Sequence, residues 1–285
     1  MIFKTTATLN NNKPKVTIVT VVYNGEKVIE DTLNSVLEQD YPSLEYIVVD
    51  GMSTDDTLRI VSRYGDRIQK VISEKDQGVY DAMNKGIKSA TGQWILFMNA
   101  GDRFYATTTL SDFFSACPAH SNDYDILYGN AEFRLKNIAY IVEASNKVTS
   151  NEYMPFSHQA AFTRTSVAKE KKFDLNYKIA ADTAFFLRLV KENHRFLHIP
   201  TTVCTYDALE GLSVNNEVKR CKEIVDLQAK WNNINPDSPY FKKYIRSAYI
   251  KQYIRKLLPL SIWIKMREKA IYKKHKTVYR IEQKG

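Results

Sequence analysis

Hydrophobic residues near the start of the chain follow two periods in turn. Residues 15–24 (KVTIVTVVYN) are a continuous β-branched run, which is typical of a strand buried on both faces of a parallel sheet. After Gly25 the apolar positions recur every three or four residues, which predicts a helix. Residues 44–57 repeat this plan, with a strand that ends at Asp50 and a turn at Gly51. The chain therefore begins with two strand–helix units.

Two more strands are predicted at residues 70–73 and 94–98, with a helix over about 78–90 between them. Strands and helices that alternate at this spacing predict a right-handed, doubly wound parallel sheet of the α/β class. Beyond the fourth strand the alternation loosens. Residues 125–133 and 139–144 have the pattern of a hairpin, so we expect the sheet to become mixed.

The second half of the chain predicts a helix over 179–194, a strand over 195–207 and mainly helical structure from about residue 217. A chain of 285 residues, 44% of them hydrophobic, is long and apolar enough for one large domain with an appendage. We expect an N-terminal segment over 1–14, an α/β domain over 15–215 and a helical basic region over 216–285.

Polar residues collect where the predicted strands end. They follow four consecutive strands: Tyr23 and Asn24, Asp50, Glu74 and Asp76, then Asn99 and Asp102. Each residue alone is compatible with ordinary turn chemistry. Because the carboxyl ends of parallel strands meet at one rim, four such groups in succession indicate a binding site. Carboxylates beside backbone amides suit a nucleotide whose phosphates are bridged by a divalent cation.

Several other classes of site have no support in the sequence. There is no G-x-G-x-x-G, no P-loop and no G-x-S-x-G elbow, which disfavours dinucleotide binding, P-loop chemistry and serine hydrolysis. Without a Walker lysine, a metal ion and scattered cations such as Lys85 and Arg103 would have to neutralise the phosphate charge. The three cysteines have unrelated spacings, which favours a reducing compartment over disulfides or zinc. No apolar leader segment and no apolar stretch of about 18 residues is present.

The order of several motifs resembles glycosyltransferase family 2, which has the GT-A fold. The likeness covers about residues 15–205, and the most similar subgroup builds bacterial cell-surface polysaccharides. It implies a nucleotide-sugar-binding half over 15–105 and an acceptor half over 106–215. The residues that carry it are VTIVTVVYNGEKVIEDTLNSVLEQDYPSLEYIVVDGMSTDDT, SEKDQGVYDAMNKGIKSATGQWILFMNAGD, FSHQAAF and YKIAADTAFFLRL.

The resemblance implies a Mg²⁺ or Mn²⁺ cofactor. Asp102 matches the last aspartate of the family's D-x-D-like metal motif, which here reads Asn99-Ala100-Gly101-Asp102. The earlier carboxylates are missing, so phosphate oxygens and waters would complete the coordination of the ion. Gly101 allows the backbone to approach the pyrophosphate closely.

The nucleotide-sugar donor is expected along the same rim. Asp50 lies where the family contacts the base and the ribose. Asp81, Asn84 and Lys85 share one face of the predicted 78–90 helix, which the family places beside the donor, although a solvated helix surface explains them equally well. The complete predicted donor set is Tyr23, Asn24, Asp50, Gly51, Asp76, Asp81, Asn84, Lys85, Asn99, Ala100 and Gly101.

Asp182 matches the catalytic base of the family. An inverting transfer needs one carboxylate to take the proton of the acceptor hydroxyl. From the residues alone, Asp182 is also explained as an acid that favours the N-terminus of a helix. His158, with Gln159 beside it, is either a contact for the acceptor or a phosphate, or a structural histidine between apolar neighbours.

Positive charge is concentrated at the C-terminus. Residues 240–285 hold 14 Lys or Arg against 2 acids, whereas residues 1–239 hold 27 against 30. A stripe of Tyr244, Ile245, Ala248, Tyr249, Tyr253, Leu257 and Leu258 is interleaved with these cations. A basic amphipathic helix of this kind is typical of peripheral binding to anionic membranes. A helical cap with a solvated outer face is the alternative, and nucleic acid is the least favoured partner.

Together these observations predict an inverting transferase that moves a sugar from a nucleotide diphosphate to a glycan or a polyprenyl-diphosphate-linked acceptor. Lipopolysaccharide or capsule synthesis at the cytoplasmic face of the inner membrane is the expected setting. A non-catalytic subunit that binds sugar nucleotides, or a scaffold subunit, remains an alternative because the metal motif is depleted. A nucleotidyltransferase, which would use the same rim, is the third hypothesis.

Overall fold

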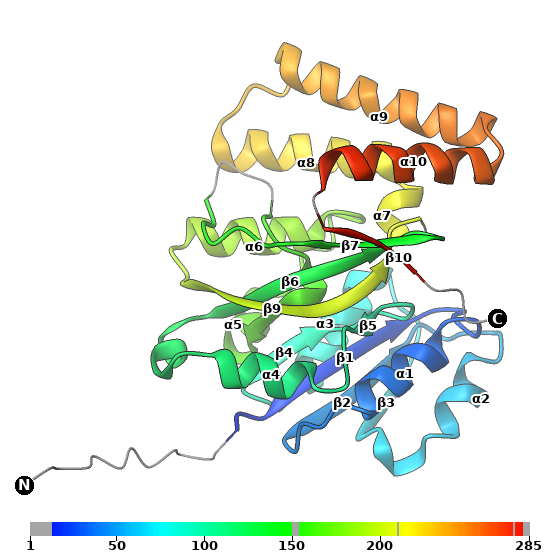
Figure 1. Ribbon diagram of the computed structural model, residues 1–285. Coiled ribbons are helices and arrows are strands. Elements are labelled where there is room, and N and C mark those ends of the chain that lie inside the picture. Colours follow the sequence, from blue (N-terminus) through cyan, green and yellow to red (C-terminus); the bar gives the residue numbers. More distant parts are fainter. Residues whose placement is uncertain (1–12, 150–153, 210, 276, 282–285) are drawn as a thin grey trace, which may run out of the picture.

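The protein is described by a computed structural model that covers residues 13–149, 154–209, 211–275 and 277–281 (Figure 1). Most of the predicted segment 1–14 therefore lies outside the described residues. In the parallel part of the sheet, β1 (Val16–Val22) lies between β2 (Leu44–Asp50) and β4 (Trp94–Phe97), and β3 (Lys70–Ser73) follows β2 at the edge. The predicted parallel, doubly wound start of the chain is confirmed.

Successive residues of β1 point into two different cores, as its β-branched sequence requires. Val19 and Val21 pack on one face of the sheet, with α3 (Val79–Ser89) and α6 (Ala181–Lys191). Ile18 and Val22 pack on the other face, with α1 (Ile29–Leu37), α2 (Thr57–Ser62) and α4 (Thr109–Ala116). Every residue of β1 is buried, so this strand is the centre of both cores.

The second half of the sheet is mixed. The predicted hairpin is present as β6 (Ile126–Arg134) and β7 (Ile138–Val142), which are antiparallel. Between β4 and β6 lies β8 (Ala161–Arg164), antiparallel to both, which the periodicity did not predict. The long strand β9 (Phe196–Asp207) runs parallel to β6 and also pairs with β5 (Arg103–Phe104). The structure is thus a mixed, mainly parallel sheet with helices on both faces.

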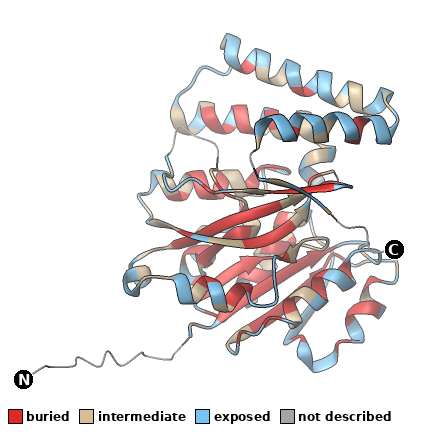
Figure 2. Ribbon diagram, viewed as in Figure 1, coloured by how far each residue is buried: buried red, intermediate tan, exposed pale blue. Residues whose placement is uncertain are grey.

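Three long helices follow α7 (Leu212–Asn215) and stack on one side of the sheet (Figure 1). They are α8 (Glu217–Asn232), α9 (Pro239–Leu257) and α10 (Leu260–Lys274). The chain then returns to the sheet, where β10 (Val278–Arg280) pairs with β7. Figure 2 shows buried strands at the centre and largely exposed outer surfaces on α9 and α10. A domain boundary at residues 215 and 216 stays a prediction.

Close contact between α3 and β1 requires a glycine at position 86. A Cβ atom there would lie 2.5 Å from Cγ1 of Val19, which is completely buried. We expect Gly86→Ala to lower the free energy of unfolding by about 1–3 kcal/mol, because the branched side chain cannot move away. Urea unfolding measures this change. The exposed Lys88→Ala on the same helix is the control, with an expected effect within about 0.5 kcal/mol. Equal stability of Gly86→Ala and wild type would contradict the close packing.

Candidate active site

The loop after β4 is fixed at the end of β1. Ala100 donates its backbone N–H to the carbonyl of Val21, which continues the parallel pairing past the strand. Gly101 adopts a φ of 98°, a left-handed conformation that favours glycine. Thr32 of α1 accepts the Gly101 N–H (2.9 Å) and donates to the Asp102 carbonyl (2.8 Å). The loop that carries Asp102 is therefore held between the central strand and the first helix.

Asp102 is half-buried beneath this loop, and its carboxylate has a neutral partner. Gln159 donates from Nε2 to Asp102 Oδ2 at 3.2 Å. Burial raises the pKa of Asp102 to about 6, although nearby His158 and the Gln159 hydrogen bond act to lower it. Because burial disfavours the charged form of this acid, a bound cation would stabilise the carboxylate.

A single turn of 3₁₀ helix, η3 (His158–Ala160), contacts both Asp102, the predicted metal ligand, and Asp182, the predicted base. His158 Nδ1 lies 3.1 Å from Oδ2 of Asp182, and its Nε2 lies 3.4 Å from Nδ2 of Asn99. Since a carboxylate only accepts, Nδ1 carries the proton in the neutral ring, and Nε2 accepts from the Asn99 amide. His158 and Gln159 thus connect Asp182 with Asn99 and Asp102 of the loop, and these five side chains share one site.

Asp182 lies in the first turn of α6 and is only 16% exposed. Its Oδ1 accepts the backbone N–H of Thr183 at 2.7 Å. The Tyr80 hydroxyl lies 3.2 Å from the same oxygen and 2.9 Å from the carbonyl of Ile179, and shares its proton between them. Burial acts to raise the pKa of Asp182, but the hydrogen bond and charge of His158, with these other donors, outweigh it and lower the pKa. The carboxylate is therefore charged and held in one orientation.

The segment before α6 is anchored from the C-terminal helices. Glu223 of α8 accepts the backbone N–H groups of Lys178 (3.1 Å), Ile179 (2.8 Å) and Ala180 (2.9 Å). Ala180 is the N-cap residue of α6, and Lys178 and Ile179 lie just before it. A residue of the predicted basic region therefore sets the position of the turn that carries Asp182.

Asp50 and Asn24 organise the rim at the ends of β1 and β2. Asp50 is fully buried and accepts from the Ser53 backbone (3.1 Å) and the Ser73 hydroxyl (2.7 Å). Asn24 Oδ1 accepts the backbone N–H of Thr54 at 2.8 Å. These contacts are turn chemistry, and contact of either residue with a nucleotide stays a prediction.

Two further predicted rim residues, Gly51 and Asp76, lie next to each other. Gly51 leaves room for the Asp76 carboxylate, because a Cβ at position 51 would overlap Asp76 Oδ2. Asp76 Oδ1 accepts the backbone N–H of Gly78 at the start of α3 (2.8 Å). The Tyr23 side chain is 63% exposed beside them, within reach of a ligand. An aromatic face next to a carboxylate is compatible with the predicted base and ribose contacts.

The three predicted donor contacts on α3 already have partners within the protein. Lys85 donates to the Lys75 carbonyl (2.7 Å) and pairs with Glu74 at 3.2 Å and Asp81 at 3.8 Å. Asn84 makes two hydrogen bonds to the backbone of Phe173, at 2.9 and 3.0 Å. These contacts fix the ends of α3, so direct donor binding by Asp81, Asn84 and Lys85 stays a prediction.

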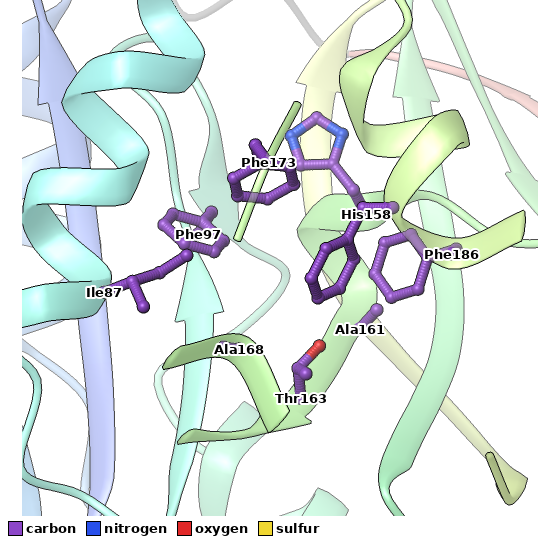
Figure 3. Close-up of a pocket in the computed structure, with 9 residues that line it drawn as sticks. Ile87, Phe97, His158, Ala161, Thr163, Ala168, Phe173 and Phe186 are labelled. Carbon is purple, nitrogen blue, oxygen red and sulfur yellow. The ribbon is translucent and has the colours of Figure 1, made fainter. Parts of the chain in front are cut away.

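A small apolar cavity lies directly below His158 (Figure 3). Its volume is about 10 Å³, room for roughly one water molecule and far too small for a sugar. The phenyl rings of Phe97, Phe173 and Phe186 line it, with Ile87 and Ala161. Apolar side chains therefore line the base of the site. The low local dielectric strengthens the interactions among the charged groups above them.

Tyr80 was not predicted as a site residue. The predicted donor-facing residues of this helix include its neighbour Asp81 but not Tyr80. Helical spacing is the sequence signal that could have identified it, since Tyr80, Met83 and Ile87 recur on the buried side of α3. A buried tyrosine usually finds a hydrogen-bond partner, so its hydroxyl pointed to a polar group in the core.

Oxygen atoms suited to a divalent cation lie on the Asn99–Asp102 loop. Oδ1 of Asn99 is buried without a hydrogen-bond partner, and the Asp102 carboxylate is three residues further along. Within the described ranges, no three or more His, Cys, Asp or Glu side chains gather closely enough to form a metal cluster. The donor set fits Mg²⁺ or Mn²⁺ only as a partial site, in which phosphates and waters supply the other ligands.

Comparison with solved structures supports the fold. A mannosyltransferase from Pyrobaculum calidifontis, PcManGT, in complex with GDP-Man and Mn²⁺, has a TM-score of 0.61 with 19% identity, over 93% of this chain and 82% of that one. Residues 1–349 of TarS from S. aureus, in complex with UDP-GlcNAc, give a TM-score of 0.56 with 19% identity, over 85% and 74%. Both likenesses confirm the predicted GT-A fold.

Comparison of sequences identifies the family. A PGL/p-HBAD biosynthesis glycosyltransferase of Mycobacterium tuberculosis is 30% identical over 209 residues, which cover 70% of this chain and 79% of the relative. The family model "Glycosyl transferase family 2" matches residues 17–181, more than half of the chain. This match spans the rim, the Asn99–Asp102 loop and η3, and it ends one residue before Asp182. The chain is a glycosyltransferase that belongs to family 2.

Proposed function

We propose that this glycosyltransferase transfers a sugar from a nucleotide diphosphate to a hydroxyl group in one displacement, with inversion at the anomeric carbon. One observation carries the proposal: η3 connects Asp182 to the Asn99–Asp102 loop, so that a charged base and a cation-binding loop face one site. Family membership favours this reading over the nucleotidyltransferase and scaffold hypotheses.

Asp182 is the proposed general base. Its low pKa keeps it charged at neutral pH, and the neighbouring hydrogen bonds fix its orientation. As the acceptor oxygen attacks the anomeric carbon, its proton moves to the carboxylate and the bond to the diphosphate breaks. Burial and the charge of Asp182 raise the pKa of Tyr80 well above its ordinary value, so Tyr80 stays a hydrogen-bond donor to the carboxylate. His158 takes the role of a positioning residue between base and donor loop.

Asp102 and Asn99 are the proposed protein ligands of Mg²⁺ or Mn²⁺. The unpartnered Oδ1 of Asn99 and the raised pKa of Asp102 are the observations that support them. When bound, the ion would neutralise charge on the leaving diphosphate. The protein's own contribution is to hold these two oxygens on a rigid loop and to keep the site floor dry.

The acceptor is proposed to be a glycan or a polyprenyl-diphosphate-linked sugar of a lipopolysaccharide or capsule pathway. The resemblance to surface-polysaccharide enzymes supports this. The proposed location is the cytoplasmic face of the inner membrane, for which the basic C-terminal helices are the structural argument.

Asp182→Asn tests the base. We expect turnover to fall by roughly 10²–10⁴-fold, the usual contribution of a general base, because the amide cannot take a proton. Donor affinity should stay within about threefold. Calorimetry with UDP-GlcNAc and GDP-mannose identifies the preferred donor, and release of its nucleoside diphosphate measures turnover. Asp174→Asn, in the preceding loop, is the control. Unchanged turnover in Asp182→Asn would remove this residue from the mechanism.

A metal role for Asp102 predicts a pH-dependent affinity. A metal ligand must be deprotonated, so Mn²⁺-dependent donor binding should weaken as the pH falls through about 6, the pKa of Asp102. Asp102→Asn should lose most of the Mn²⁺ dependence, whereas Asp66→Asn on the surface should keep it. Calorimetric titration of the donor with Mn²⁺ or EDTA measures both effects. Equal donor affinity of wild type with Mn²⁺ and with EDTA would contradict a metal role.

His158→Gln tests the positioning role through the pH profile. His158 lowers the pKa of Asp182, and the base works only when deprotonated. Without His158 the pKa values of Asp182 and Asp102 should both rise, so the acidic limb of kcat/KM should move to higher pH. His194→Gln is a matched control, because His194 also pairs with an aspartate, Asp125, at 3.0 Å. An unshifted limb in His158→Gln would show that His158 only supports the fold.

A further inference from the structure

Exposed hydrophobic side chains gather on the last two helices. Ten of the sixteen large exposed hydrophobic residues in the described part of the chain lie between Tyr240 and Tyr279. The densest group surrounds the corner between α9 and α10, and we call it the corner patch. It consists of Tyr249, Ile250, Tyr253, Leu257, Leu260, Ile262 and Met266. Groups of exposed apolar residues near one corner of the fold often mark an interaction surface.

Helical spacing explains why the patch faces outward. Tyr249, Tyr253 and Leu257 are four residues apart and lie on one face of α9. The opposite face packs inward: Lys251 pairs with Glu217 of α8 at 3.3 Å, and Arg255 donates to the carbonyls of Val214 (3.2 Å) and Leu209 (3.1 Å).

The stripe predicted from the sequence therefore combined two faces of α9. Ala248 is buried, and Tyr244 and Ile245 are half-buried, so these three belong to the inner side. Tyr249, Tyr253 and Leu257 of that stripe remain on the outer face. The outward surface is shorter than predicted and centred on the corner.

Cations border the patch in line with its apolar residues. Arg246 and Lys242 lie on the same face of α9 as Tyr253, about two and three turns before it. Lys256 and Lys265 lie at the corner, and all four side chains are exposed. Glu268 is the single acid among the described residues of α9 and α10, and it accepts a hydrogen bond from Asn137. The surface thus combines exposed Leu and Tyr with an excess of positive charge, although Lys242 is paired with Asp237 at 3.6 Å.

We propose that the corner patch docks on an anionic phospholipid bilayer. The tyrosine and leucine side chains would enter the boundary between headgroups and acyl chains, and the flanking lysines and arginines would contact lipid phosphates. In the described residues no helix is long and apolar enough to span a membrane. In Figure 1 the corner lies on the same side of the view as the arrowhead of β1, the strand end that leads to the candidate active site. Docking there would bring a membrane-held acceptor to that side of the enzyme.

Tryptophan probes on the full-length chain test the orientation. Tyr253 and Tyr240 are both 65% exposed and belong to the same helix, but Tyr240 lies at its far end. With vesicles of phosphatidylglycerol and phosphatidylethanolamine, brominated lipids should quench the added fluorescence of Tyr253→Trp and leave that of Tyr240→Trp unchanged. Equal quenching of both probes, or no binding to these vesicles at low salt, would overturn the proposal.

Charge variants test the lipid chemistry. Each basic residue near an anionic surface contributes about fivefold to binding, so Lys256→Gln with Lys265→Gln should lower the partition coefficient roughly 25-fold. Arg67→Gln with Lys88→Gln, on other exposed faces, should change it less than twofold. Vesicle sedimentation measures both, and it is independent of the proposed transfer chemistry. Equal effects of the two pairs would overturn the proposal.

A second copy of the chain is the competing occupant of the patch. Leu257→Ser with Leu260→Ser removes two exposed side chains, so the fold should tolerate it. The proposal expects weaker vesicle binding and an unchanged mass in sedimentation equilibrium. A change from dimer to monomer with unchanged vesicle binding would assign the patch to self-association and overturn the proposal.

Discussion

The hydrogen bond between His158 and Asp182 is the contact on which the site depends. It joins a turn at the start of β8 to the first turn of α6. Because Gln159 follows His158 directly, the same turn also holds Asp102. The proposed base and the proposed cation-binding loop are therefore linked through this short turn, which leads into β8 between β4 and β6.

The sequence predicted the elements that depend on local patterns. β-branched runs predicted β1 and β2, because burial on both faces leaves a continuous apolar run. Burial of one helix face leaves an apolar residue every three or four positions, which predicted α1 and α3. The site acids Asp102 and Asp182 came from motifs that resemble a family, and from the rule that parallel strands end at one rim. These inferences need only neighbours in sequence or a known order of motifs.

Contacts between distant segments could not be predicted in the same way. Nothing in the local pattern of Ala161–Arg164 indicates insertion between β4 and β6. Glu223 lies 41 positions after Asp182, and its role in anchoring the turn before α6 depends on how α8 packs. Asn84 fitted a donor-facing surface by spacing, but its amide is bonded to the Phe173 backbone. Tertiary packing decides such cases, since a polar side chain binds whichever group the fold brings near.

A crystal structure of Asp182→Asn with Mn²⁺ and its preferred nucleotide sugar would test the central claim most directly. We expect the diphosphate to bind at the Asn99–Asp102 loop and the anomeric carbon to lie between that loop and residue 182. The substituted amide should face the side of the sugar opposite the leaving group. A donor bound elsewhere on the sheet, or a residue 182 directed away from the sugar, would contradict it.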